Sequence, residues 1–244
     1  MTKSTCKPQP PSGTAIYTPL FLRLYDPLVL GLINSLAWRC STKHDLLPLF
    51  TTSLGRRHAD VGVGSGFFPS TALVNASHDQ RCDSITLIDL NTDALQTARR
   101  RILNTGTSTE VKTLQADILS PPLHLTNTNP PDDETKFDSI TIFYLLHCLP
   151  GPAEAKIRTV LQSVVPLLSA DGLLVGATIL GRGREVNVLG RALLALFNWW
   201  GVFGNEGDEE AVFRDALVAS FRHVDVWCVG AVMLFRARGP KGSP

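Results

Sequence analysis

The stretch HADVGVGSGFF, residues 58–68, sets three glycines, Gly62, Gly64 and Gly66, directly behind the acidic residue Asp60. The apolar run before the glycines indicates a buried strand, and the residues after them, 69–77, favour a helix. Glycine adopts positive φ angles and lets a ligand approach bare backbone. In an open α/β sheet, ligands bind where the first strand turns into its helix. The stretch therefore predicts a strand–turn–helix unit that carries a ligand site.

The rest of the chain repeats this alternation of short apolar strands and helices. Further strands are expected at 84–90, 111–119, 137–146 and 172–180, and helices at 25–40, 46–54, 91–103 and 154–168. Such alternation implies parallel strands joined by right-handed crossovers. Two last strand-like runs, 222–230 and 231–239, lie too close together for a crossover helix and predict an antiparallel hairpin. We expect a doubly wound, mostly parallel seven-stranded sheet of the α/β class with a C-terminal hairpin.

Composition bounds the organisation and the partners. The 244 residues, 44% of them hydrophobic, fit one domain over residues 16–238 between tails at 1–15 and 239–244. A net charge of +1 argues against nucleic acid as a partner, and no apolar run is long enough for stable membrane insertion. The five cysteines are scattered without a CxxC pair, so we expect no disulfide framework and no metal. A polar start without a signal peptide favours the cytoplasm.

Two ligand classes that use glycine-rich loops do not fit the motif. A dinucleotide fingerprint, GxGxxG, fails because its last glycine is replaced by Phe67 or Pro69, depending on the register. A phosphate-binding Walker loop fails because no Gly-Lys-Ser/Thr closes the turn. The carboxylate of Asp60 would also repel a pyrophosphate. The ligand is therefore expected to lack phosphate.

The segment DVGVGSG resembles the first motif of the class I S-adenosylmethionine-dependent methyltransferases. LIDLNTDAL and LQADIL are similar to the following motifs, and the resemblance implies that Asp89 holds the ribose hydroxyls and Asp117 contacts the adenine amine. Residues 137–151 and 164–180 look like the fourth and fifth strands of the ubiquinone-biosynthesis type. The likeness covers roughly residues 17–238 and implies S-adenosyl-L-methionine as cofactor. Its expected binding residues are Tyr17, Tyr25, Asp60, Gly62, Gly64, Gly66, Asp89, Leu90, Asp117, Ile118 and Tyr144.

Three further regions are expected to complete the site. His147 follows the fourth strand, so we expect it at the mouth of the cleft, as a general base or as a structural or cofactor-side residue. Residues 16–50 are predicted to form lid helices, whose tyrosines either meet the sulfonium by cation–π attraction or pack in the core. Residues 181–207 are predicted to form an apolar cap over the substrate, with an ordinary core helix or a dimer contact as alternatives. The expected substrate-contacting residues are His147, Phe197, Trp199, Trp200 and Phe203.

These features predict methyl transfer to a fairly hydrophobic small molecule in specialised metabolism. The alternative is a cyclase or pericyclase that keeps the fold and the cofactor without transferring the methyl group, because fold alone does not fix function. A non-catalytic binding module is a third reading. The sequence leaves open whether oxygen, nitrogen or carbon receives the methyl group and whether the protein forms a homodimer.

Overall fold

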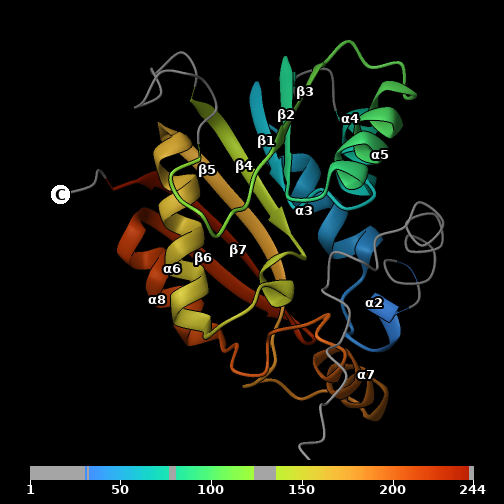
Figure 1. Cartoon of the computed structure of the whole chain (residues 1–244), viewed down its shortest axis with the longest axis vertical. Coiled ribbons are helices and arrows are strands. Elements are labelled where there is room, and N and C mark those ends of the chain that lie inside the picture. The colour runs from blue at the N-terminus through green and yellow to red at the C-terminus, as the bar shows by residue number, and fades with distance from the viewer. Residues whose placement is uncertain (1–30, 32, 77–80, 124–135, 242–244) are drawn as a thin grey trace, which may run out of the picture.

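The computed structural model of the chain describes residues 31, 33–76, 81–123 and 136–241 (Figure 1). Seven strands form one sheet in the order β3-β2-β1-β4-β5-β7-β6. The strands are β1 (Arg57–Val61), β2 (Ser84–Asp89), β3 (Glu110–Gln115), β4 (Phe137–Phe143), β5 (Leu168–Ile179), β6 (Phe221–Val229) and β7 (Val232–Pro240). The first five strands run parallel, and β7 is antiparallel to both β5 and β6. The predicted fold class is confirmed.

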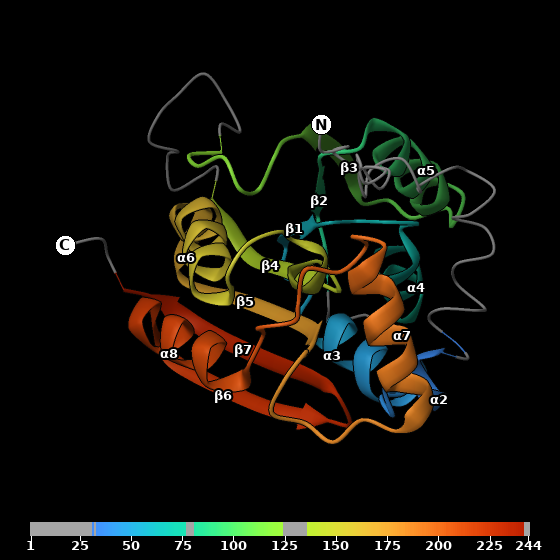
Figure 2. The ribbon, with the colours of Figure 1, turned by 60° about the horizontal axis from the view of Figure 1, so that its bottom comes forward.

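Helices cover both faces of the sheet (Figure 2). α6 and α8 lie on one side, and α3, α4 and α5 lie on the other, while α7 lies near α2 beyond the carboxyl ends of the parallel strands. The α-helices are α2 (Asn34–Leu36), α3 (Leu47–Thr52), α4 (Phe67–Asn75), α5 (Thr92–Leu103), α6 (Ala153–Val164), α7 (Val188–Trp199) and α8 (Glu210–Ser220). Short π- and 3₁₀-helical turns are η3 (Thr42–Leu46), η5 (Leu146–Cys148) and η6 (Val165–Leu167).

The strand order places the first switch in direction at β1. β1 pairs with β2 on one side and with β4 on the other. The chain therefore adds β2 and β3 on one side of β1 and then β4 and β5 on the other side. Asp89 lies 29 residues after Asp60, more than the roughly 20 residues of a compact βαβ unit. Between these two residues, α4 ends at Asn75 and β2 begins only at Ser84. β2 still ends at Asp89, in register with β1. The glycine-rich turn therefore lies at the position where open α/β sheets bind ligands.

Some element bounds differ from the sequence-based expectation. The predicted helix 154–168 ends as α6 at Val164, because Pro166 cannot donate the helical hydrogen bond and the chain tightens into η6. β5 then begins at Leu168, and β7 extends through Pro240, past the expected domain end at residue 238. Residues 25–30 and 32 of the predicted helix 25–40 lie outside the described residues. The short α2 is the only α-helix in its described part, and Arg39 has a positive φ of 54°, so the helix does not continue to residue 40. Across the described ranges, no helix combines the length and the hydrophobicity needed to cross a membrane.

Candidate active site

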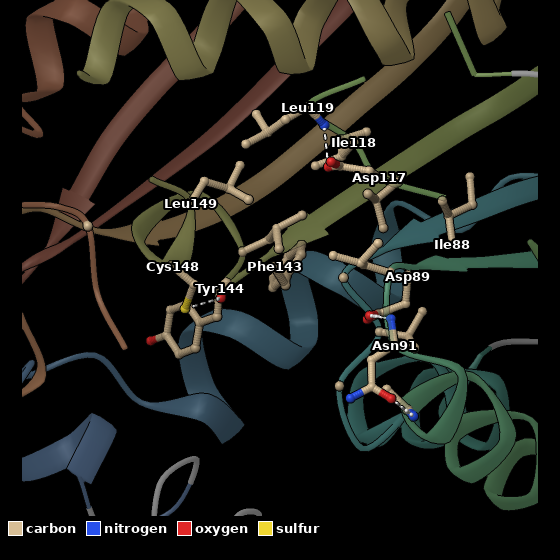
Figure 3. Close-up of a pocket in the computed structure, with 18 of the residues that line it drawn as sticks. Ile88, Asp89, Asn91, Asp117, Ile118, Leu119, Phe143, Tyr144, Cys148 and Leu149 are labelled. Carbon is tan, nitrogen blue, oxygen red and sulfur yellow. Dashed lines mark hydrogen bonds between the residues drawn. The ribbon is translucent and has the colours of Figure 1, made fainter. Parts of the chain in front are cut away.

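A cavity of about 660 Å³ opens at the carboxyl ends of the parallel strands (Figure 3). This volume falls in the usual range for small-molecule sites. At one end the glycine-rich turn and the residues that follow β2 and β3 form the wall. At the other end, the wall comes from the chain after β4 and from the segment Gly201–Gly204. Figure 3 shows Asp89 and Asn91 on one side of the cavity and Tyr144 and Cys148 across from them.

The three motif glycines have positive φ angles but different surroundings. Gly62, Gly64 and Gly66 have φ of 75°, 51° and 71°, which L-amino acids other than glycine rarely adopt. A Cβ atom on Gly64 would meet no protein atom within 4 Å, whereas one on Gly66 would lie 2.6 Å from Cα of Ala98 in α5. Gly62 and Gly64 line the cavity and Gly66 does not. Gly64 therefore gives a ligand access to bare backbone, and Gly66 lets the turn pack on α5.

Two predicted carboxylates line the cavity at successive strand ends. Asp89 ends β2 and accepts a hydrogen bond of 2.9 Å from the backbone N–H of Asn91. Burial raises the pKa of the Asp89 carboxyl, although several backbone N–H groups oppose this shift. Asp117 follows β3 and accepts a 2.9 Å bond from the N–H of Leu119. The predicted neighbours Leu90 and Ile118 also line the cavity.

Asp60 lies behind the cavity wall. It is 3% exposed, and the Thr141 hydroxyl donates a 2.7 Å hydrogen bond to its Oδ1. Burial raises the pKa of the Asp60 carboxyl to about 7, against the effect of the Thr141 bond, and the charge of Asp89 raises it further. Of the predicted motif residues, Asp60 and Gly66 thus do not line the cavity. They lie behind the glycine-rich turn and support it.

The far end of the cavity is mostly apolar. Phe143, Tyr144, Leu149 and Phe203 line it together with Cys148. Tyr144 follows β4 with a positive φ of 58°, which is uncommon for a residue with a side chain. Its N–H donates to the carbonyl of Ala177 on β5 at 2.8 Å. The predicted Tyr144 therefore joins the end of the sheet to the apolar end of the cavity.

Comparisons with known proteins identify the family. The family described as "Methyltransferase domain" matches residues 59–174. The "Physcion biosynthesis cluster O-methyltransferase" of Aspergillus chevalieri is 39% identical over 94% of this chain and 96% of its own length. The "O-methyltransferase adaD" of Aspergillus niger is 36% identical, over 92% and 87% of the two chains.

The chain belongs to the class I S-adenosylmethionine-dependent methyltransferases. Among solved structures, the N-methyltransferase NodS from Bradyrhizobium japonicum, in complex with S-adenosyl-L-homocysteine, superposes with a TM-score of 0.54. It shares 19% sequence identity and covers 82% of this chain and 86% of its own, which supports the fold. The expected activity, S-adenosylmethionine-dependent methyl transfer in specialised metabolism, is confirmed by the relatives, and the cyclase alternative is not favoured.

The residues at the polar end of the methyltransferase cavity fit this cofactor. S-adenosylmethionine carries a sulfonium and no phosphate, so carboxylates beside a bare glycine backbone suit it better than they suit a nucleotide phosphate. Gly64 leaves open space, Asp89 presents a carboxylate, and Ile88 and Ile118 supply apolar surface for an adenine ring. S-adenosyl-L-methionine is the cofactor of this family, and the donor set observed here matches it.

His147 does not lie at the mouth of the methyltransferase cavity, contrary to the expectation. It is 3% exposed and does not line the cavity. Its Nδ1 accepts a long bond of 3.4 Å from the N–H of Ile179, and its ring packs 4.6 Å from the ring of Phe203. Burial and, to a smaller extent, the charge of Lys156 lower the pKa of His147 to about 3. The turn η5 directs this side chain inward, which favours a structural role.

The buried position of His147 predicts a loss of stability in acid. The unfolded chain binds a proton at this histidine below pH about 6.5, whereas the folded chain does so only near 3. The stability that the folded protein has from keeping this histidine neutral is therefore fully present above about pH 6.5 and is lost as the pH falls toward 3. Between about pH 7 and about pH 5, the free energy of unfolding decreases by about 2 kcal/mol for this reason.

We expect His147→Gln to reduce the difference in unfolding free energy between these two pH values by that amount, as measured by urea denaturation. The exposed His223 on β6 provides the control, because His223→Gln should leave the difference unchanged. We also expect His147→Gln to retain methyl transfer at neutral pH. Complete loss of activity in a folded variant would restore the general-base assignment.

The predicted substrate residues of α7 are mostly turned away from the cavity. Trp199 and Trp200 are 76% and 46% exposed, and Phe197 packs against Phe203 at a ring distance of 5.0 Å without lining the cavity. The chain reverses after α7 at Gly201, whose φ is 69°, and this turn brings Phe203 to the cavity. Of the expected substrate-contacting residues, all of which the structure describes, Phe203 alone lines the cavity. Tyr17 and Tyr25 lie outside the described residues.

Several cavity residues were not predicted from the sequence. Asn91 lies beside Asp89 and also caps α5, its Oδ1 accepting from the N–H of Asp93 at 2.8 Å. Its place directly after the strand-end carboxylate was the available signal. Other unpredicted lining residues include Val63, Ser65, Phe67, Phe68, Ile88, Leu119, Phe143, Leu145, Cys148, Leu149 and Val202.

Proposed function

We propose that this methyltransferase transfers the methyl group to an oxygen atom of a hydrophobic phenol. The observation that carries the proposal is the continuity of the cavity, whose carboxylate-lined end runs into a mostly apolar end. The aromatic side chains of Phe143, Tyr144 and Phe203 at this apolar end favour a hydrophobic, aromatic acceptor. The relatives from Aspergillus chevalieri and Aspergillus niger are named O-methyltransferases, which supports oxygen as the receiving atom.

Each end of the cavity has a separate task in this proposal. Asp89 accepts hydrogen bonds from the ribose hydroxyls, Asp117 and Ile118 hold the adenine, and the backbone at Gly62 and Gly64 approaches the methionine part. The bound cofactor supplies a methyl group already activated on a sulfonium. Tyr144 and Phe203 hold the acceptor ring, so the protein contributes alignment and the exclusion of water.

Further parts of the proposal concern regions around the cavity. Residues 181–207 serve as a cap, acting through Phe203 and its neighbours in the turn after α7. Of the predicted lid, residues 16–50, the part 16–30 and residue 32 lie outside the described residues, and residues 31 and 33–50 do not line the cavity. We propose that the enzyme lies in the cytoplasm and forms a homodimer. Its partner in this proposal is a small molecule and not a nucleic acid. The small-molecule partner follows from the family.

A matched pair of acceptors tests the proposed chemistry. The enzyme is incubated with methyl-labelled S-adenosylmethionine and either 1-naphthol or 1-naphthylamine, which share a ring system and differ in the acceptor atom. We expect label in the methyl ether of 1-naphthol, equimolar S-adenosylhomocysteine, and no labelled amine by mass spectrometry. Methylation of the amine but not of the phenol would reject oxygen as the acceptor, and label on ring carbon would reassign the reaction to carbon.

A further inference from the structure

A fully buried ion pair lies beside the apolar end of the cavity. The side chains of Lys156 in α6 and Asp208 before α8 are 0% and 1% exposed. The Nζ atom of Lys156 lies 2.8 Å from each carboxylate oxygen of Asp208. Neither residue lines the cavity, and neither has a role in the proposed binding of cofactor or acceptor.

The same ammonium group holds two carbonyls of the cavity wall. Lys156 Nζ donates to the carbonyl oxygen of Gly204 at 2.8 Å and lies 3.5 Å from that of Leu149. Leu149 and Gly204 both line the cavity, and they belong to segments far apart in the chain. With Asp208, these carbonyls give the three N–H donors of the ammonium three acceptors. The ion pair thus ties together the two segments that form the apolar wall.

Asp208 connects this wall to the end of the sheet. Its backbone carbonyl accepts from the N–H groups of Gly181 and Arg182, directly after β5, at 3.1 Å each. Asn205 extends the connection, because its Nδ2 donates to the carbonyl of Ile179 at 3.0 Å. Gly204 is held from its other side as well, since its N–H donates to the carbonyl of His147 at 2.8 Å. The segment Gly201–Gly204 is therefore anchored to β5, η5 and α6.

A buried ion pair is a poor source of stability, because desolvation of the two charges offsets their attraction. A well-packed apolar pair of the same size is often equally stable or more stable. An apolar pair, however, has no donor for the carbonyls of Leu149 and Gly204. The distinguishing property of this arrangement is the fixed geometry of the wall.

We propose that Lys156, paired with Asp208, is a positioning residue that holds Leu149 and Gly204 in place to form the acceptor-binding wall. This rests on the proposed function, because the wall is assigned to the acceptor. The cofactor end of the cavity is built from residues that end or follow β1, β2 and β3, whereas the Lys156 ammonium bonds to Leu149, Gly204 and Asp208. Loss of the pair should therefore affect acceptor binding and leave cofactor binding intact.

The test compares a double replacement with a matched control on the same helix. Lys156→Met with Asp208→Leu removes both charges and keeps similar side-chain volumes, so no buried charge is left unpaired. Arg158→Met removes the exposed pair of Arg158 with Glu154, whose side chains are 67% and 74% exposed. Lys156→Met alone leaves the carboxylate of Asp208 unpaired, so the double variant is the one that keeps the fold for the assay.

Three readouts separate positioning from general stability. In the double variant, we expect the rate of hydrogen–deuterium exchange of the backbone amides at residues 201–204 to rise about tenfold or more. This is the effect of losing one charged hydrogen bond, here the bond from Lys156 to the carbonyl of Gly204. We expect the KM for 1-naphthol to rise by a similar factor while kcat changes less. The Kd for S-adenosylmethionine, measured by calorimetry, should stay within about twofold of the wild type, and Arg158→Met should match the wild type throughout.

Unchanged exchange at residues 201–204 in the folded double variant would overturn the proposal, since the wall would then be ordered without the pair. An unchanged KM for 1-naphthol would overturn it as well. Equal weakening of S-adenosylmethionine binding would show a general loss of structure instead of positioning. If the wild type does not methylate 1-naphthol, the proposed acceptor fails, and the exchange measurement still decides whether the pair holds the wall.

Discussion

Gly66→Ala is expected to destabilise the protein strongly, whereas Gly64→Ala is expected to weaken cofactor binding in a protein that stays folded. At Gly66, a side chain meets both a backbone conformation of φ 71° and the backbone of α5, with Cα of Ala98 only 2.6 Å from the new Cβ. The left-handed conformation and the overpacking together cost about 2–5 kcal/mol. This is a large part of the stability of an ordinary domain.

The matched variants separate the two effects of a side chain in this loop. At Gly64 the new Cβ has open space in the protein but stands beside the cavity, so backbone strain of about 1–2 kcal/mol accompanies a loss of affinity for S-adenosylmethionine. Gly106 has φ of 74° and the same open space, but it does not line the cavity. Gly106→Ala should therefore show the strain without the loss of affinity. Thermal unfolding and calorimetric titration check the three variants, and equal stability of Gly64→Ala and Gly66→Ala would contradict the packing argument.

The positions of Asp89 and Asp117 on the cavity could be predicted from the sequence because they follow from a local rule. A residue at the carboxyl end of a parallel strand faces the shared edge of the sheet, so Asp89 and Asp117 are placed once the strands are recognised. The same rule misplaced His147. The chain leaves β4 through Tyr144 at positive φ and enters η5, which turns His147 inward and leaves Cys148 on the cavity.

The apolar end depends on contacts between distant segments, which a local pattern does not contain. The apolar surplus of α7 predicted a cap, but the exposed Trp199 and Trp200 could be oriented only by knowing which face of the helix packs on the core. The pair of Lys156 and Asp208 joins residues 52 apart in the chain, and neither position carries a motif. Its partners became recognisable only when the fold brought them to one wall.

Asp89→Asn is expected to lower the affinity for S-adenosylmethionine by about 10- to 100-fold. Removing a hydrogen bond to a charged group costs about 1.5–3 kcal/mol of binding free energy. The amide keeps an oxygen that can accept from the N–H of Asn91, so the local turn survives. Because burial raises the pKa of the Asp89 carboxyl, its charge is held at a cost in the cofactor-free protein. The variant should therefore unfold at the wild-type temperature or slightly above it when no cofactor is present.

Calorimetry with both forms of the cofactor locates the interaction. S-adenosylmethionine and S-adenosylhomocysteine carry the same ribose and differ at the sulfur, so contact with the ribose hydroxyls predicts an equal loss of affinity for the two. A loss confined to S-adenosylmethionine would instead place the Asp89 carboxylate near the sulfonium, because only that form carries the positive sulfur. Asp93→Asn, an exposed change in the first turn of α5, is the control and should bind both forms as the wild type does.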